Sequence, residues 1–147
     1  MKKLLMSVFA FALIATNLNA NQTTQNAKQI VTEFFEMAFT HRQPIKAAKI
    51  YISETKYIQH NPEGADGRDA FINGFAKYML STDYKAVIKR VIAEDDLVVV
   101  HAHGKLKPSD RGEAVVDIFR VENGKIVEHW DVIQQIPEKS ANDNTMF

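Results

Sequence analysis

The chain has 147 residues and a formal net charge of zero, with 18 basic and 18 acidic residues. It contains no cysteine, which excludes disulfide bonds and thiolate zinc sites. A near-neutral chain without a basic run lacks the electrostatic pattern of proteins that bind nucleic acid or anionic lipid. We therefore expect a small molecule or another protein as partner, and no nucleic acid.

The first twenty residues have the pattern of a secretory signal peptide. Met1, Lys2 and Lys3 form a positive start, residues 4–18 are almost wholly apolar, and Ala20 is a small residue at a plausible cleavage point. A membrane anchor is the alternative, but the apolar run is shorter than the ~20 residues that a bilayer requires. The sequence thus predicts a periplasmic or secreted protein that has no membrane association after cleavage.

Cleavage would leave 127 residues with 16 basic and 18 acidic side chains, because Lys2 and Lys3 would be lost. That length suits one domain with a single hydrophobic core. We expect this domain to span residues 27–137, between a flexible lead-in at 21–26 and a flexible tail at 138–147.

Helical periodicity dominates the first half of the domain. Apolar residues recur at helical spacing over residues 27–42, and Pro44 suits the first turn of a short helix that continues to Ile50. A third helix is predicted over residues 68–80, with Asp66 as a candidate N-cap.

From Tyr84 onward the pattern becomes that of β-strands. Turn residues interrupt it at 94–96, at 107–112 and at Asn123–Gly124, which favours an antiparallel meander of four strands. Helices followed by a meander indicate an α+β fold in which the helices cover one face of the sheet. If the sheet curls around the first helix, it forms a cone with a ligand cavity at its open end.

One acidic residue is out of place in this pattern. Asp117 shares its strand face with Val115 and Phe119, so it is expected to be functional or paired. His103, on the preceding strand, could meet Asp117 as a cross-strand neighbour. The alternative for Asp117 is a structural ion pair with Arg120 or a lysine.

Three segments resemble a known family when they are taken together. Residues 57–62, 98–103 and 117–132 are similar to the SnoaL-like polyketide cyclase group of the NTF2-like (cystatin-like α+β) superfamily, and the resemblance spans about residues 27–136. It implies a curved-sheet cone and a cofactor-free intramolecular aldol condensation. By position in the motif, Asp117 matches the acid–base aspartate of that group and His103 its neighbouring histidine.

These residue types suit the implied chemistry. An aldol closure needs a base that removes a proton next to a carbonyl and a group that stabilises the enolate oxygen. A carboxylate in an apolar cavity is a stronger base because desolvation raises its pKa. His103 could orient Asp117 or donate to the substrate, and His60 and Asn61 could supply polar contacts at the mouth of the cavity.

Alternatives remain open for the other histidines. His101 lies two residues from His103 on the same strand face, so both could contact substrate, or bind a metal together with His60. No carboxylate at convincing ligand spacing completes that set, so we predict no metal, and the family resemblance implies no cofactor. His60 and Asn61 precede Pro62 and could equally form a simple turn.

Strand alternation leaves the last strand undecided. Glu128 and Trp130 share one face, and His129 and Asp131 share the other, so Asp131 is a candidate pocket residue only if His129 also points inward. Trp130 is either a substrate-stacking wall or an aromatic residue of the core or of a dimer interface.

Three functions therefore remain. The leading hypothesis is a SnoaL-like enzyme that removes a proton next to the carbonyl of a small apolar substrate. The second is a non-catalytic periplasmic protein that binds such a compound in the same cone. The third is an interaction module whose sheet face pairs two chains, and a homodimer is the expected assembly in each case.

Overall fold

The structure is a computed structural model that describes residues 21–147. The expected signal peptide, residues 1–20, lies outside the described residues. Within the described part of the chain, no helix combines the length and the apolar character needed to cross a membrane.

Helices form the first half of the domain, as the periodicity predicts. The N-terminal helix covers residues 21–35 and continues as the π-helical turn η1, Glu36–Thr40, so it already includes the expected lead-in. Helix α2 spans Pro44–Tyr51 with its proline in the first turn. The third predicted helix comprises α3 (Arg68–Phe71), the π-helical turn η2 (Ile72–Ala76) and α4 (Lys77–Ser81).

The predicted cap of the third helix is wrong. Gly67 occupies the N-cap position with a φ of 99°, and no side chain caps the helix. The Asp66 carboxylate instead accepts a hydrogen bond of 2.8 Å from the backbone N–H of Gln59. Asp66 therefore stabilises the loop that leads to the helix.

Four long strands form the expected antiparallel meander. They are β2 (Lys85–Glu94), β3 (Leu97–Lys105), β4 (Glu113–Glu122) and β5 (Lys125–Gln135). A short strand that the sequence pattern did not reveal, β1 (Ile58–Gln59), pairs in parallel with β5. The strand order is β1-β5-β4-β3-β2. The parallel β1–β5 pair makes the sheet mixed instead of wholly antiparallel.

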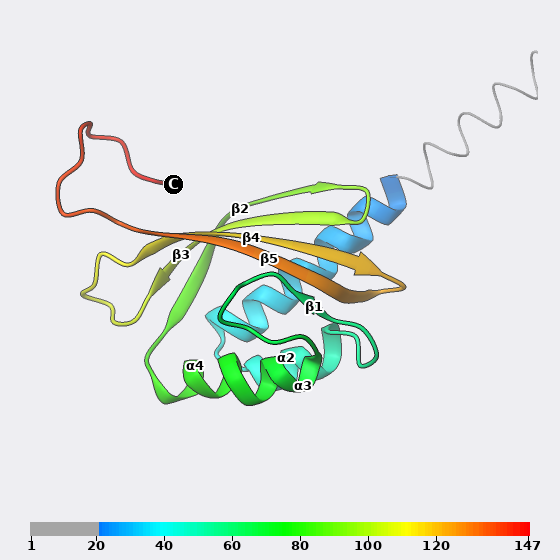
Figure 1. Cartoon of the computed structure of the whole chain (residues 1–147). Coiled ribbons are helices and arrows are strands. Elements are labelled where there is room, and N and C mark those ends of the chain that lie inside the picture. Colours follow the sequence, from blue (N-terminus) through cyan, green and yellow to red (C-terminus); the bar gives the residue numbers. More distant parts are fainter. Residues whose placement is uncertain (1–20) are drawn as a thin grey trace, which may run out of the picture.

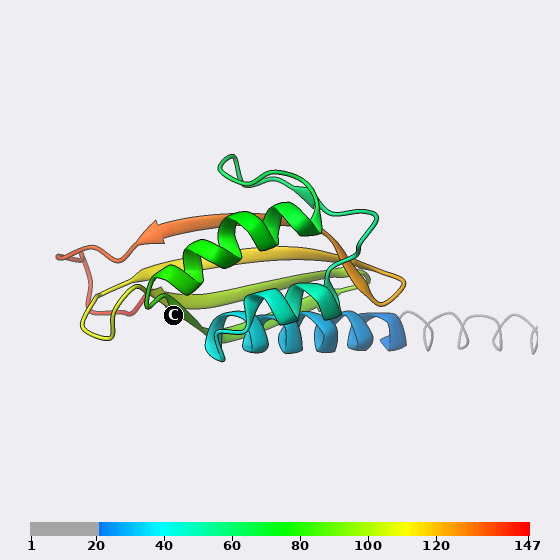
Figure 2. The ribbon, with the colours of Figure 1, turned by 90° about the horizontal axis from the view of Figure 1, so that it is seen from below.

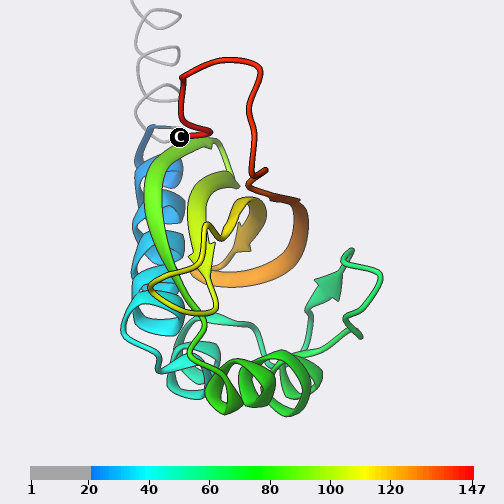
Figure 3. The same ribbon diagram turned by 90° about the vertical axis from the view of Figure 1, so that its left-hand side faces the viewer.

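The sheet is strongly curved, and the helices lie on one of its faces (Figures 1 and 2). Seen along the strands, it curls over the helices without closing (Figure 3). Aromatic rings fill the space between the two layers. The ring centroids of Phe34, in the N-terminal helix, and Phe119, in β4, are 5.7 Å apart. The α+β fold with helices packed on a curved sheet is thus confirmed.

The C-terminal tail returns to the outer face of the sheet, the one away from the helices. Residues 138–147 leave β5 and turn back over the strands (Figures 1 and 3). The ring of Phe147 stacks on that of His103, with the centroids 4.5 Å apart, and its centroid lies 5.3 Å from that of His101. Part of the outer face is thereby covered by the chain itself.

Candidate active site

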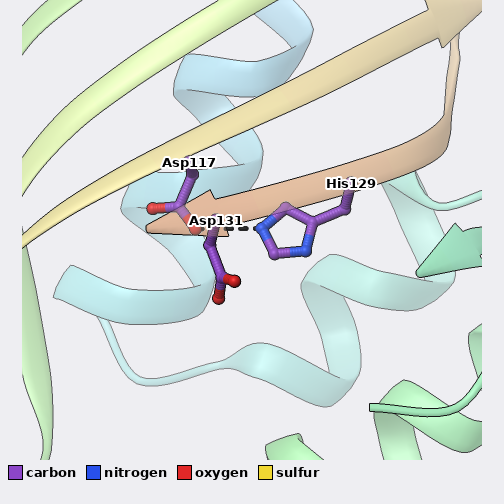
Figure 4. Close-up of side chains that lie close together, drawn as sticks. All are labelled: Asp117, His129 and Asp131. Carbon is purple, nitrogen blue, oxygen red and sulfur yellow. Dashed lines mark hydrogen bonds and ion pairs between the residues drawn. The ribbon is translucent and has the colours of Figure 1, made fainter. Parts of the chain in front are cut away.

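Three ionisable side chains of β4 and β5 meet on the inner face of the sheet, which faces the helices (Figure 4). In the strand register Asp117 pairs with Asp131, and Phe119 pairs with His129. Residues opposite one another, and residues two apart on one strand, project to the same side. Asp117, His129 and Asp131 therefore share one face with the apolar core.

Asp117 and His129 form a buried pair. They are 6% and 8% exposed, and His129 Nε2 lies 2.9 Å from Asp117 Oδ1. Desolvation by burial raises the pKa of Asp117, and nearby Asp131 and Glu113 raise it further, whereas the hydrogen bond and charge of His129 act in the opposite direction. The net shift is upward, so this carboxyl binds a proton more readily than a carboxyl in water.

Side chains from β1 and the loop after it contact the two site residues of β5. Gln59 lies opposite His129 in the parallel pairing, and its Oε1 is 2.9 Å from His129 Nδ1. Asn61, two residues later, donates from Nδ2 to both oxygens of Asp131, at 2.9 and 2.8 Å. Each ionisable residue of β5 in the site is thus positioned by one amide side chain.

Two tyrosines complete the polar surroundings. Tyr57 is 5% exposed, and burial together with the charges of Asp117 and Asp131 raises its pKa. Burial also raises the pKa of Tyr84, whose hydroxyl donates to Glu113 Oε1 at 3.2 Å. Both phenols therefore stay protonated and can donate a hydrogen bond.

The site also contains donors of the kind that bind divalent cations. Asp117, His129 and Asp131 each offer one ligand atom, and these atoms lie within 4.8 Å of one another. Imidazole and carboxylate suit several transition metals. The Nε2 and Oδ1 atoms are, however, already at hydrogen-bond distance from each other, so an ion would have to replace the proton between them.

The predicted contact between His103 and Asp117 is wrong. The register between β3 and β4 pairs Val100 with Asp117, and His103 with Ala114, so His103 projects to the outer face. There its Nε2 lies 2.8 Å from the backbone oxygen of Arg111 in the β3–β4 turn. The histidine beside Asp117 is His129 instead.

The structure also places three other candidates on the outer face. His101 contacts Arg90, while His60 and Trp130 stack with their ring centroids 4.6 Å apart. His60 Nε2 further lies 2.9 Å from a Glu128 oxygen. These three side chains therefore lie on the opposite side of the sheet from Asp117, and the structure does not bring His60 together with His101 and His103 in a group that could hold a metal ion.

Among the predicted substrate-binding residues, Asn61 and Asp131 lie in the site. His129, Gln59 and Tyr57 also lie in the site, although no role was predicted for them. For His129 the signal was present, because strand alternation places it on the same side as Asp131. Gln59 and Tyr57 could not be found this way, since the parallel pairing of β1 with β5 leaves no mark in the sequence pattern.

The family model described as the SnoaL-like domain matches residues 31–129. The chain belongs to the SnoaL-like family. The matched segment of this SnoaL-like chain includes the Asp117–His129 pair and ends just before Asp131. No curated protein matches the chain at a significant level.

Solved structures share the SnoaL-like fold at low sequence identity. A candidate ketosteroid isomerase from Kribbella flavida DSM 17836 is 15% identical with a TM-score of 0.63, covering 81% of this chain and 85% of its own. A candidate SnoaL-like polyketide cyclase from Jannaschia sp. CCS1 is 16% identical with the same TM-score, covering 76% and 87%. TsrD from Streptomyces laurentii is 18% identical with a TM-score of 0.59, covering 74% and 88%. These similarities show the fold alone.

Proposed function

We propose that this SnoaL-like protein is a cofactor-independent enzyme that removes a proton next to the carbonyl of a small apolar substrate. Aldol cyclisation and double-bond isomerisation both begin with this step. The observation that carries the proposal is the buried Asp117–His129 pair, because a carboxyl with a raised pKa is suited to removing a proton from carbon. Two structural neighbours carry the names ketosteroid isomerase and polyketide cyclase, and both names denote enzymes whose reactions are of this class.

Asp117 is the proposed base. Among the described residues its hydrogen bond is made through Oδ1, which leaves Oδ2 for the substrate proton. Tyr57 is the proposed donor to the enolate oxygen, since its buried hydroxyl stays protonated beside Asp117. Asp131 is partly exposed, so we place the approach of the substrate along its side chain.

The surroundings suit an apolar substrate. The ring of Phe71 lies 6.5 Å from that of Tyr57, and the ring of Phe75 lies 6.5 Å from that of Tyr84. Phe75 is 39% exposed, so apolar surface next to the site is open to a ligand. Burial of such surface would provide binding energy and exclude water from the carboxyl.

The proposed setting is the periplasm or the extracellular medium. It is supported by the signal-like pattern of residues 1–20 and by the absence of cysteine, which makes folding independent of the redox compartment. Fractionation of cells that express the full chain tests this location. A protein that is found in the cytoplasm with residues 1–20 still attached would contradict it.

The proposed function is tested by deuterium exchange. The protein is incubated in D₂O with a β,γ-unsaturated ketosteroid and, separately, with a set of cyclic ketones, and loss of the proton next to the carbonyl is followed by proton NMR. We expect Asp117→Asn to slow this exchange by a factor of about 10² to 10⁴, as for loss of a general base. His103→Gln, on the outer face, is the matched control and should retain the wild-type rate.

The same experiment separates the enzyme from the non-catalytic binder. Binding of each compound is measured by titration calorimetry for the wild-type protein and for Asp117→Asn. If both proteins bind a compound equally and neither exchanges its proton, the enzyme hypothesis fails and the binding protein remains.

A further inference from the structure

The contact between Asp117 and His129 requires a proton, and the structure shows which neighbour imposes this requirement. His129 uses both ring nitrogens, Nε2 at 2.9 Å from Asp117 Oδ1 and Nδ1 at 2.9 Å from Gln59 Oε1. A neutral imidazole carries a proton on only one nitrogen, and its partner on the other nitrogen must be a donor. The identity of the Gln59 atom therefore decides the state of the pair.

The orientation of the Gln59 amide is fixed independently of His129. The backbone N–H of Asn61 points at the same Gln59 atom from 2.9 Å, and a backbone N–H can only donate. That atom is therefore the carbonyl oxygen Oε1, which accepts from both neighbours. The other end of the amide, Nε2, faces the hydroxyl of Tyr57 at 3.5 Å.

The protonation of His129 follows from this orientation. Because Gln59 Oε1 can only accept, Nδ1 of His129 carries a proton. In the neutral ring Nε2 is then a bare lone pair, which would face a lone pair of Asp117 if that carboxylate were ionised. A proton must lie between Nε2 and Oδ1, held either by the carboxyl or by an imidazolium.

We propose that Gln59 is a positioning residue that fixes His129 in the Nδ1–H form, so that the Asp117–His129 pair holds one transferable proton. This inference rests on the proposed function and deepens it. As Asp117 Oδ2 takes the proton from the substrate carbon, the proton on Oδ1 moves to His129 Nε2. The C–H bond breaks, O–H and N–H bonds form, one O–H bond breaks, and the products are a neutral carboxyl, an imidazolium and a substrate enolate.

Gln59 also acts after the transfer. The positive charge of the imidazolium is shared by Nδ1–H, whose acceptor is Gln59 Oε1. The same bond is already present in the neutral ring, so only its strengthening counts: from about 0.5–1.5 to about 1.5–3 kcal/mol, which corresponds to a factor of about 5 to 10 in rate. The contact therefore favours the state in which the substrate has lost its proton.

The test is the ring-nitrogen NMR of ¹⁵N-histidine-labelled protein, which needs neither substrate nor turnover. The wild-type protein should show a protonated Nδ1 on His129 throughout the stable pH range. In Gln59→Leu the Nδ1–H form should lose its preference, and Gln59→Glu, which retains an acceptor oxygen, should restore it. Asn61→Leu is the matched control, because it removes the contact to Asp131 but keeps the backbone N–H.

The exchange assay supplies the second measurement. Gln59→Leu should lower kcat by about 5- to 10-fold with little change in KM, and Gln59→Glu should recover part of it. A wild-type His129 that is neutral with its proton on Nε2 overturns the inference, whatever the activity. A spectrum that changes on treatment with EDTA also overturns it, since a metal ion would then bridge the pair. Failure of the proposed function alone would leave the Nδ1 proton in place with no exchange in any protein.

Discussion

At the scale of single residues, the environment of Asp117 has a measurable consequence for stability. Burial raises the pKa of this carboxyl above its ordinary value of 3.8, so folding favours the protonated form. The contribution of Asp117 to stability is then fully present below the ordinary value and declines as the pH rises toward the folded-state pKa.

A comparison with Asp117→Asn isolates this effect, because asparagine does not titrate. The free energy of unfolding of the wild-type protein, relative to the variant, should fall as the pH rises above 3.8. Urea unfolding of both proteins at a series of pH values measures the difference. A difference that rises with pH would mean that the pKa of Asp117 is lowered.

The strand pattern of the sequence identified one residue of the site and missed the histidine beside it. Asp117 was identifiable because a charged residue between Val115 and Phe119 breaks an apolar strand face. The expected partner, His103, was wrong, because the pairing between β3 and β4 depends on the register across the turn at 107–112. That register places Val100, and not His103, opposite Asp117.

At the scale of elements, the segment around β1 is fixed to β5 by contacts on both faces of the sheet. Gln59 and Asn61 contact the inner site, while His60 between them contacts Glu128 and stacks on Trp130. The hydrogen bond from His60 lowers the pKa of Glu128, helped by Arg120. Such alternation explains how a strand of two residues keeps its register.

Removing the outer contact should loosen β1. We expect His60→Ala to reduce the local stability of this segment by about 1 kcal/mol, the usual scale of an aromatic stack or a partly exposed ion pair. Hydrogen exchange of the residue-60 amide, which bonds to the His129 carbonyl at 2.9 Å, reports this change. Lys56→Ala, which breaks the exposed Lys56–Glu122 pair, is the control, and an equal effect there would contradict the argument.

The β4–β5 turn offers a second test at this scale. Asn123 and Gly124 have φ angles of 50° and 75°, as the Asn-Gly pair predicts for a tight hairpin. Gly124→Ala should destabilise the protein by about 1–2 kcal/mol because a Cβ disfavours positive φ. Gly74→Ala, in the helical turn η2, should be neutral or stabilising, since open space surrounds the added carbon. Thermal unfolding distinguishes the two.

At the scale of the whole molecule, the periodicity of the sequence predicts the two layers and their order along the chain. It could not predict β1, because two residues carry no alternation and their partner lies far away in the sequence. The core joins the layers through Phe119, which is 2% exposed and contacts both Phe34 and His129. The same side chain thus supports the fold and the site.

Truncation of Phe119 should therefore affect the entire domain. We expect Phe119→Ala to cost about 3–5 kcal/mol in unfolding free energy, the range for large aromatic residues in cores. Val132→Ala, at a side chain that is 70% exposed, should stay within about 0.5 kcal/mol of the wild type. Similar losses in urea unfolding for the two variants would contradict the assignment of the core.

The expected homodimer stays a prediction. The outer face of the sheet exposes apolar side chains such as Val87, Ile92 and Val132, which a second copy could cover. Light scattering should give the mass of two chains for the wild-type protein and of one chain for Val132→Glu. A single-chain mass for the wild type would contradict the prediction. The outer face of the sheet would then contact Phe147 and solvent instead of a second chain.

The proposed chemistry depends on Asp117 being a buried carboxyl that binds its proton above the ordinary pH range while it is hydrogen bonded to His129. Carbon-13 NMR titration of the Asp117 carboxyl, assigned by comparison with Asp117→Asn, tests it most directly. We predict a midpoint above 3.8 and a carboxyl signal that responds to substitution of His129 by Gln. A midpoint at or below 3.8, with no response to His129→Gln, would contradict the claim.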